Sequence, residues 1–193
     1  VHSYGLAAAQ LARLRDREIP VTACIDKVAA SGGYLMAAVA NHIVAAPFAV
    51  VGSIGVVAQL PNFHRILKKH DIDVELHTAG EYKRTLTVFG ENTEAGRSKF
   101  REDLEHTHAL FKSFVQRFRP SLDMDKAATG EFWYGEQALE IGLVDELRTS
   151  DALIGARIRD TDVFKVVYRR KEPVSQRISL AMNNALERFL HRG

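Results

Sequence analysis

Apolar residues recur along the chain at strand and helix spacings that alternate with one another. Short β-branched or apolar runs predict buried strands at 21–25, 42–46, 50–57 and 74–77. An Ala- and Leu-rich pattern predicts a helix over 4–17, ended by Pro20, and shorter helices are expected at 34–40, 65–70 and 137–141. Six apolar positions at three- and four-residue steps predict a long helix over 94–118. The alternation indicates an α/β fold with a parallel-rich sheet flanked by helices.

The composition changes after about Asp162, where basic residues dominate. Pro173 separates a strand-like run at 163–167 from a helix-like segment at 175–191 with one apolar and one basic face. We therefore expect two parts, 1–162 and a basic C-terminal tail at 163–193. The tail suits an anionic membrane surface or a partner groove, and a frayed terminus is the alternative.

Charge and cysteine content exclude several classes of protein. The net charge of +2 over 193 residues gives no electrostatic basis for a nucleic-acid binder, so no nucleic acid is expected as a partner. The single cysteine, Cys24, cannot form an intrachain disulfide, and it has no paired Cys or His at zinc spacing. Pro47, Gly52 and Gly55 interrupt the longest apolar stretch, which therefore predicts buried strands rather than a membrane span.

A serine between small residues marks the predicted junction of a strand and a helix. Ser31 follows Ala29-Ala30 and precedes Gly32 and Gly33, so its side chain can project freely while the next N–H groups point at one spot. Such a spot favours developing negative charge, as in acyl transfer. A helix cap at Ser31 with turn-forming glycines explains the same residues.

A serine nucleophile needs a base, and histidine is the usual one. None of the eight histidines stands in a Gly-flanked loop with an acidic partner, and we expect ordinary core or surface roles for them. Lysine is the other option, because an apolar site favours its neutral, proton-accepting form. Lys83 is the candidate, since it follows Gly80-Glu81-Tyr82 in a predicted loop, although a surface role is the ordinary one for a lysine.

Four blocks together give a family resemblance. They are Ala30-Ser31-Gly32-Gly33-Tyr34, Gly52-Ser53-Ile54-Gly55-Val56, Gly80-Glu81-Tyr82-Lys83 and the run from Tyr134 to Glu146. In this order they resemble the signal peptide peptidase A family of serine proteases, most closely its SohB branch. The resemblance implies a crotonase- or Clp-protease-like α/β fold, a Ser-Lys dyad, and neither a metal nor an organic cofactor.

The resemblance also assigns roles by position. The nucleophile falls on Ser31 and the general base on Lys83, and a second serine that holds the lysine amine falls on Ser53. Gly32 and Gly33 would supply oxyanion-binding N–H groups. The 1–162 part would then be the catalytic domain. Gly130-Glu131-Phe132-Trp133 departs from the family pattern, and Trp133 is expected in the core or an interface.

The chain opens with Val1 and not with Met, so we expect residues before it. The resemblance implies that these residues carry the first strands, an oxyanion donor and a membrane anchor. The predicted protein is an endopeptidase that cleaves short, extended, apolar peptides, such as signal peptide remnants, at the bacterial inner membrane. We expect a homo-oligomer, because the phenylalanine-rich face of 94–118 exceeds what a small domain hides. The alternatives are a crotonase-type acyl-CoA enzyme and a non-catalytic membrane-associated assembly protein.

Overall fold

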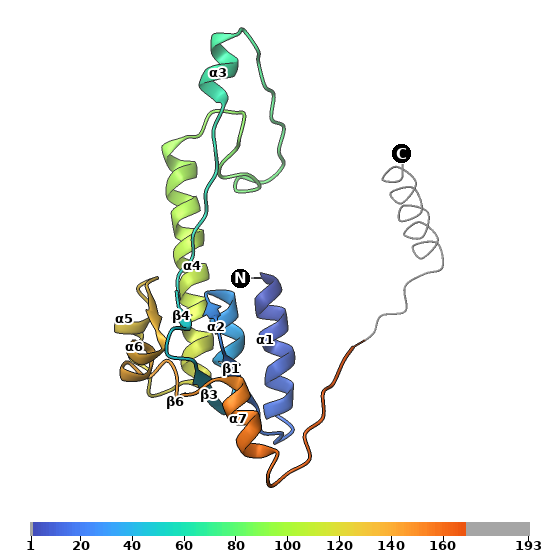
Figure 1. Ribbon diagram of the computed structural model, residues 1–193. Helices are drawn as coiled ribbons and strands as arrows, with labels where there is room; N and C mark the ends of the chain where they lie inside the picture. The colour runs from blue at the N-terminus through green and yellow to red at the C-terminus, as the bar shows by residue number, and fades with distance from the viewer. Residues whose placement is uncertain (1, 169–193) are drawn as a thin grey trace, which may run out of the picture. The chain divides into compact units, whose positions relative to one another are not determined.

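The structure is a computed structural model that describes residues 2–168 (Figure 1). The chain divides after Ala156 into two compact units. The first unit contains both sheets and the helices that cover them. In the described part of the second unit, residues 162–168 form neither helix nor strand and are exposed, so the predicted strand at 163–167 is wrong. The boundary predicted at 162/163 stays a prediction, and the predicted helix at 175–191 lies outside the described residues.

Within the described residues, six short strands form two three-stranded sheets. The first sheet has the order β1-β3-β6, with every pair parallel: β1 Thr22–Ile25, β3 His42–Ala45 and β6 Glu146–Leu147. The second has the order β2-β4-β5: β2 Val28–Ala30, β4 Val50–Gly52 and β5 Phe132–Tyr134. β2 and β4 are parallel, whereas β4 and β5 are antiparallel. The predicted class, α/β with a parallel-rich sheet flanked by helices, is confirmed.

Helices cover the strands and complete the core. The helices are α1 His2–Arg15, α2 Gly32–Ala37, α3 His64–Lys69, α4 Glu94–Phe118, α5 Met124–Ala127, α6 Gly135–Glu140 and α7 Ser150–Arg157. α1 packs beside α2 (Figure 1), and the approach is close: a Cβ on Gly32 would lie 2.3 Å from the Tyr4 ring. α4 buries Phe111 and Val115 against this core, and the Thr93 side chain caps its first turn by accepting from the Gly96 N–H.

Two further predicted strands differ from the structure, and one observed strand was not predicted. Residues 74–77 are exposed and form no strand, because a short alternating apolar and polar run is stable as a strand only when a neighbouring strand pairs with it. The strand predicted at 50–57 ends at Gly52, where the backbone turns at positive φ. β5 was not predicted, and it contains Trp133, which packs against the core as expected.

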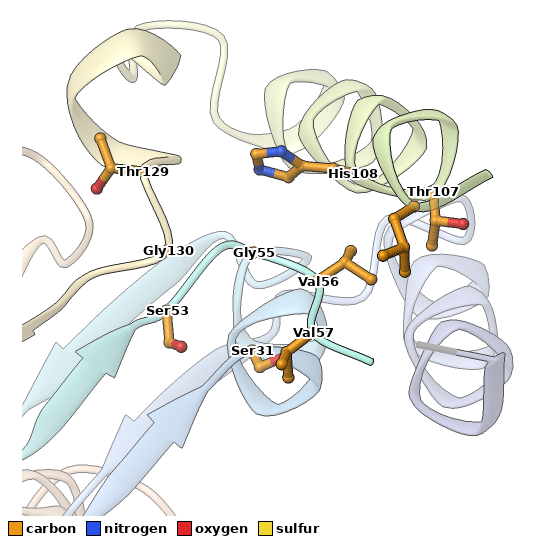
Figure 2. Close-up of a pocket in the computed structure, with 10 residues that line it drawn as sticks. Ser31, Ser53, Gly55, Val56, Val57, Thr107, His108, Thr129 and Gly130 are labelled. Atoms are coloured by element: carbon orange, nitrogen blue, oxygen red, sulfur yellow. The ribbon is translucent and has the colours of Figure 1, made fainter. Parts of the chain in front are cut away.

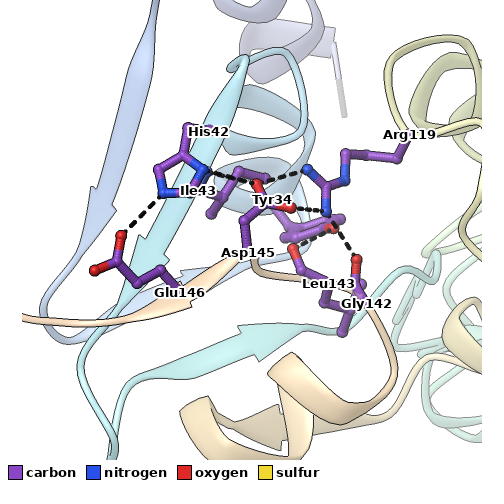
Figure 3. A network of polar contacts seen from close by, with 8 residues as sticks. All are labelled: Tyr34, His42, Ile43, Arg119, Gly142, Leu143, Asp145 and Glu146. Carbon is purple, nitrogen blue, oxygen red and sulfur yellow. Dashed lines mark hydrogen bonds and ion pairs between the residues drawn. The ribbon is translucent and has the colours of Figure 1, made fainter.

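A polar network ties α2 to the first sheet and to the end of α4 (Figure 3). The fully buried Tyr34 donates its hydroxyl to the carbonyl of Leu143 at 2.9 Å. Arg119 and Asp145 form two hydrogen bonds, of 2.6 and 2.8 Å, and the Ile43 N–H donates to the same carboxylate. Burial raises the pKa of Tyr34, so the phenol stays protonated and remains a donor. The hydrogen bond from Tyr34 therefore fixes α2, the helix that follows Ser31, to the segment that carries Leu143.

The Asp145 carboxylate is kept charged within this network. Burial alone raises the pKa of Asp145, but the hydrogen bonds from Arg119 and from the Ile43 N–H, together with the Arg119 charge, outweigh it and lower the pKa below its ordinary value. The Arg119 guanidinium also donates to the Gly142 carbonyl at 3.0 Å. Gly142 lies at φ +83, as expected for a glycine that stops a helix.

Candidate active site

Two serines lie side by side at the carboxyl ends of two parallel strands. Ala30 of β2 is in register with Gly52 of β4, so the next residues, Ser31 and Ser53, leave the sheet at the same edge. The Ser31 N–H donates to the carbonyl of Gly52 at 2.7 Å, which joins the two loops directly. Parallel strands carry binding sites at this edge in open α/β sheets. The structure therefore brings together two residues that are 22 positions apart.

Both serines hold an uncommon backbone conformation. Ser31 lies at φ 50° and ψ −118°, and Ser53 also lies at φ 50°. A non-glycine residue pays about 1–3 kcal/mol for such a conformation and keeps it only where the surroundings impose it. Ser31 occupies the turn from β2 into α2, and a strained strand-to-helix turn is the geometry that exposes a nucleophilic serine in other hydrolases. Ser31 combines such a conformation with a place in a strand-to-helix turn, whereas Ser53 follows β4 in a loop.

The loop that carries Ser53 is confined by its neighbours. Gly52 lies at φ +99°, and a Cβ there would lie 2.8 Å from the Trp133 ring. A Cβ on Gly55 would lie 3.0 Å from the Cα of Gly130. The Ser53 N–H donates to the carbonyl of Glu131 at 2.6 Å. Only glycine permits this close approach of the two backbones, which narrows the path of the loop around Ser53.

A cavity of about 680 Å³ opens beside the two serines. Ser31 and Ser53 lie near one another at its floor, and α4 passes along its other side (Figure 2). Val56, Val57 and Leu104 give it an apolar wall. The remaining lining residues are Gly55, Thr107, His108, Thr129 and Gly130. Both serines are partly exposed, so a substrate has access to their hydroxyl groups.

Gly32 and Gly33 open α2 directly after Ser31, so the helix predicted at 34–40 begins two residues earlier and ends at Ala37. The first N–H groups of a helix have no acceptor within the helix. The oxyanion-binding role predicted for these two glycines stays a prediction. Gly32 is buried under Tyr4, whereas a Cβ on Gly33 would meet no atom within 4 Å. Neither glycine is among the residues that line the cavity.

Lys83 stands apart from the serines within one chain. Its side chain is exposed, in the loop after α3, and it does not line the cavity. The adjacent Tyr82 ring lies 5.7 Å from the Lys99 Nζ, in the N-terminal part of α4. His108, on the cavity, is nine residues further along that helix, which corresponds to about 14 Å. The role predicted for Lys83 stays a prediction.

His108 was not singled out by the sequence reasoning. It lines the cavity, and its Nε2 lies 3.0 Å from the carbonyl oxygen of Ile54. A signal was present, because His108 is four residues after Leu104 and three before Phe111, and so lies on the apolar stripe of the helix. A polar side chain on the core-facing stripe of a helix needs a hydrogen-bond partner, but the sequence does not show which group that partner is.

The described residues contain neither a cluster of metal ligands nor a membrane-spanning helix. Over 2–168, no group of three or more His, Cys, Asp or Glu side chains is placed to hold a metal ion. Within the same residues, no helix combines the length and the apolar character needed to span a bilayer.

Comparison with known proteins decides the family. The model of the family described as Peptidase family S49 matches residues 13–163, most of the chain. The chain belongs to this family. It is 56% identical over 192 residues to "Probable protease SohB" of Haemophilus influenzae, a match that covers 100% of this chain and 54% of the relative. It is 60% identical over 157 residues to a protein of the same name from Buchnera aphidicola, covering 81% of this chain and 52% of the relative.

These S49 relatives are longer proteins, and the chain spans about half their length. A more distant match is "Putative protease MJ0651" of Methanocaldococcus jannaschii, 32% identical over 151 residues, covering 76% of this chain and 49% of the relative. Among solved structures, an enoyl-CoA hydratase/isomerase family protein from Hyphomonas neptunium is 19% identical with a TM-score of 0.40, covering 77% of this chain and 40% of that one. A likeness this weak supports no argument about this S49 chain, and the crotonase-like topology stays a prediction.

Proposed function

We propose that the protein is a serine endopeptidase in which Ser31 is the nucleophile. The observation that carries the proposal is the strained turn at Ser31, which connects β2 to α2 beside an accessible cavity in a member of a peptidase family. The Ser31 Oγ attacks the carbonyl carbon of a peptide bond and forms a tetrahedral intermediate. The N–H groups at Gly32 and Gly33 stabilise its oxyanion, to which a single donor typically contributes about 100- to 1000-fold in turnover.

Lys83 is the proposed general base. Its neutral amine takes the proton of the Ser31 hydroxyl and returns it to the leaving amine, after which water hydrolyses the acyl-enzyme. Ser53 orients the lysine amine by a hydrogen bond, the part that a carboxylate plays for a histidine base. Because Lys83 and Ser31 lie apart within one chain, we place the dyad between two copies in a homo-oligomer. The exposed apolar side chains of the segment that carries Lys83 support such contacts: Leu60, Phe63, Ile66, Ile72, Val74, Leu76 and Phe89.

The proposed substrates are short, extended, apolar peptides such as signal peptide remnants. The apolar wall of the cavity supports this class, since Val56, Val57 and Leu104 would receive an apolar side chain next to the scissile bond. Val57 is 92% exposed, so binding would remove its surface from water. An extended peptide would add along a sheet edge through its main chain.

The proposed location is the bacterial inner membrane. It rests on the family resemblance and on the basic, amphipathic pattern of 175–191, which lies outside the described residues. Co-sedimentation with anionic vesicles tests the tail, by comparing the full-length protein with a form that ends at Pro173. Equal binding of the two forms would exclude the tail as a membrane contact.

The test of the proposed activity is labelling with a fluorophosphonate, followed by peptide mapping. We expect one adduct on Ser31, together with hydrolysis of a fluorogenic apolar peptide by the full-length protein. A crotonase-type acyl-CoA enzyme or a non-catalytic assembly protein would show neither an adduct on Ser31 nor peptide hydrolysis. Labelling of another serine, with Ser31 unmodified, would show that the nucleophile is wrongly assigned.

A further inference from the structure

The ring of His108 is anchored to the loop that carries Ser53. Its Nε2 lies 3.0 Å from the carbonyl oxygen of Ile54, the residue that follows Ser53. A carbonyl oxygen only accepts, so Nε2 must carry the hydrogen and donate it. With its Nε2 hydrogen committed to this carbonyl, the ring is placed to hold the loop and not to take a proton from Ser31 through the same atom.

The other hydrogen bonds of this loop run between backbone groups. The Ser53 N–H donates to the Glu131 carbonyl at 2.6 Å, and the Gly55 N–H donates to the Ser53 carbonyl at 2.9 Å. Over the described residues, the bond from His108 is the only side-chain hydrogen bond to residues 52–55. It comes from the middle of α4, a 25-residue helix whose later turns are fixed in the core by Phe111 and Val115. The core-anchored helix α4 thus fixes the carbonyl of Ile54, next to the strained Ser53.

We propose that His108 is a positioning residue, which holds Ser53 at the angle from which its hydroxyl orients the catalytic base. The inference rests on the proposed function for the role of Ser53, and it assigns to His108 no contact with the reacting atoms. Ser53 lies at φ 50°, a strained backbone conformation. Without the hydrogen bond from His108 to the neighbouring Ile54 carbonyl, the loop would relax toward an ordinary backbone conformation.

Three variants of the full-length protein test this role. His108→Leu removes the donor, His108→Gln keeps an amide N–H at a similar reach, and His106→Leu is the control on the same helix, because His106 is exposed. We expect His108→Leu to lower kcat by about 10- to 100-fold with KM nearly unchanged, the pattern for a misplaced catalytic group. His108→Gln should recover most of this loss, and His106→Leu should match the wild type. A loss confined to KM, or equal losses in the Leu and Gln variants, would overturn the proposal.

A double variant asks whether His108 acts through Ser53. If it does, adding His108→Leu to Ser53→Ala should cost no further activity, because the group that His108 holds is already absent. If the loss of activity in the double variant equals the product of the two single losses, His108 does not act through Ser53.

Amide hydrogen exchange measures how firmly the Ser53 loop is held, and it needs no activity measurement. We expect His108→Leu to speed exchange at the Ser53 and Gly55 amides by about tenfold or more, while His108→Gln and His106→Leu leave it unchanged. Unchanged exchange in His108→Leu would overturn the proposal, whatever the kinetics. If the wild type neither hydrolyses peptides nor labels at Ser31, the proposed function fails by itself, and the exchange rates still decide whether His108 holds the loop.

Discussion

The backbone N–H of Ser31 donates to the carbonyl of Gly52, the residue before Ser53, at 2.7 Å. The two serines of the candidate site are therefore joined through one hydrogen bond at the ends of paired parallel strands. A change that moves one of these loops should therefore also displace the other.

Removing either serine hydroxyl should reduce peptide hydrolysis to different degrees. Ser31→Ala removes the nucleophile and should abolish turnover, whereas Ser53→Ala disturbs only orientation and should retain measurable turnover. Both proteins should fold like the wild type, since neither serine is fully buried. Steady-state kinetics with a fluorogenic peptide measures the difference. An equal loss in the two variants would mean that their roles are wrongly divided.

Mixing two inactive variants should restore activity if the dyad forms between subunits. Ser31→Ala and Lys83→Ala are each expected to be inactive as pure proteins, because nucleophile and base act as one unit. Subunits exchanged between them would pair an intact Ser31 with an intact Lys83 from another copy. We expect up to about half the wild-type rate after exchange, measured against unmixed samples. No recovery after proven subunit exchange would place both residues of the dyad in one chain.

Alanine at Gly52 should destabilise the protein and lower its activity. Gly52 lies at φ +99°, and the new Cβ would lie 2.8 Å from the Trp133 ring. We expect a cost of about 1–3 kcal/mol in the free energy of unfolding, together with reduced turnover because the adjacent Ser53 is displaced. Chemical denaturation and peptide hydrolysis measure the two effects.

Gly155→Ala is the matched control for this substitution. Gly155 lies in α7, where a Cβ would meet no atom within 4 Å. Alanine there should leave activity unchanged and stabilise the helix by up to about 1 kcal/mol. Similar destabilisation by the two substitutions would remove the strained turn as the explanation.

The ion pair of Asp145 with Arg119 should stabilise the fold at neutral pH and lose this effect in acid. The folded-state pKa of Asp145 is lowered, so its contribution is complete above the unfolded value of about 3.9 and is lost as the pH falls through the folded-state pKa. Asp145→Asn should cost about 1–2 kcal/mol at pH 7, or about 3–6 °C in Tm.

The difference between wild type and Asp145→Asn should shrink below about pH 4, because the unfolded chain then takes up a proton on Asp145 that the folded chain, with its lowered pKa, does not bind until the pH is lower still. Thermal denaturation over a pH series measures this. Glu105→Gln, at an exposed position of α4, is the control and should change Tm little at any pH. A difference between wild type and Asp145→Asn that stays constant with pH would show that the charge of Asp145 does not stabilise the fold.

Elements with a strong local signal were predicted from the sequence. The helix 94–118 agrees with α4 in its bounds, because 25 residues of one amphipathic period and a Thr93 cap determine it locally. The turn of Ser31 with Gly32 and Gly33 was found for a similar reason, since small residues between a strand and a helix leave few other conformations. The four spaced motifs also indicated the peptidase family that comparison confirms.

Only the tertiary structure decided which distant residues meet. The strand predicted at 74–77 is absent although apolar and polar residues alternate there, because within residues 2–168 no neighbouring strand supplies the hydrogen bonds. His108 looked ordinary, because its significance comes from the carbonyl of Ile54, 54 positions away. The sequence named Ser31 and Ser53 separately, and the parallel register of β2 and β4 places them at one edge. Such contacts depend on how the sheet pairs, and pairing is a property of the whole fold and not of any segment.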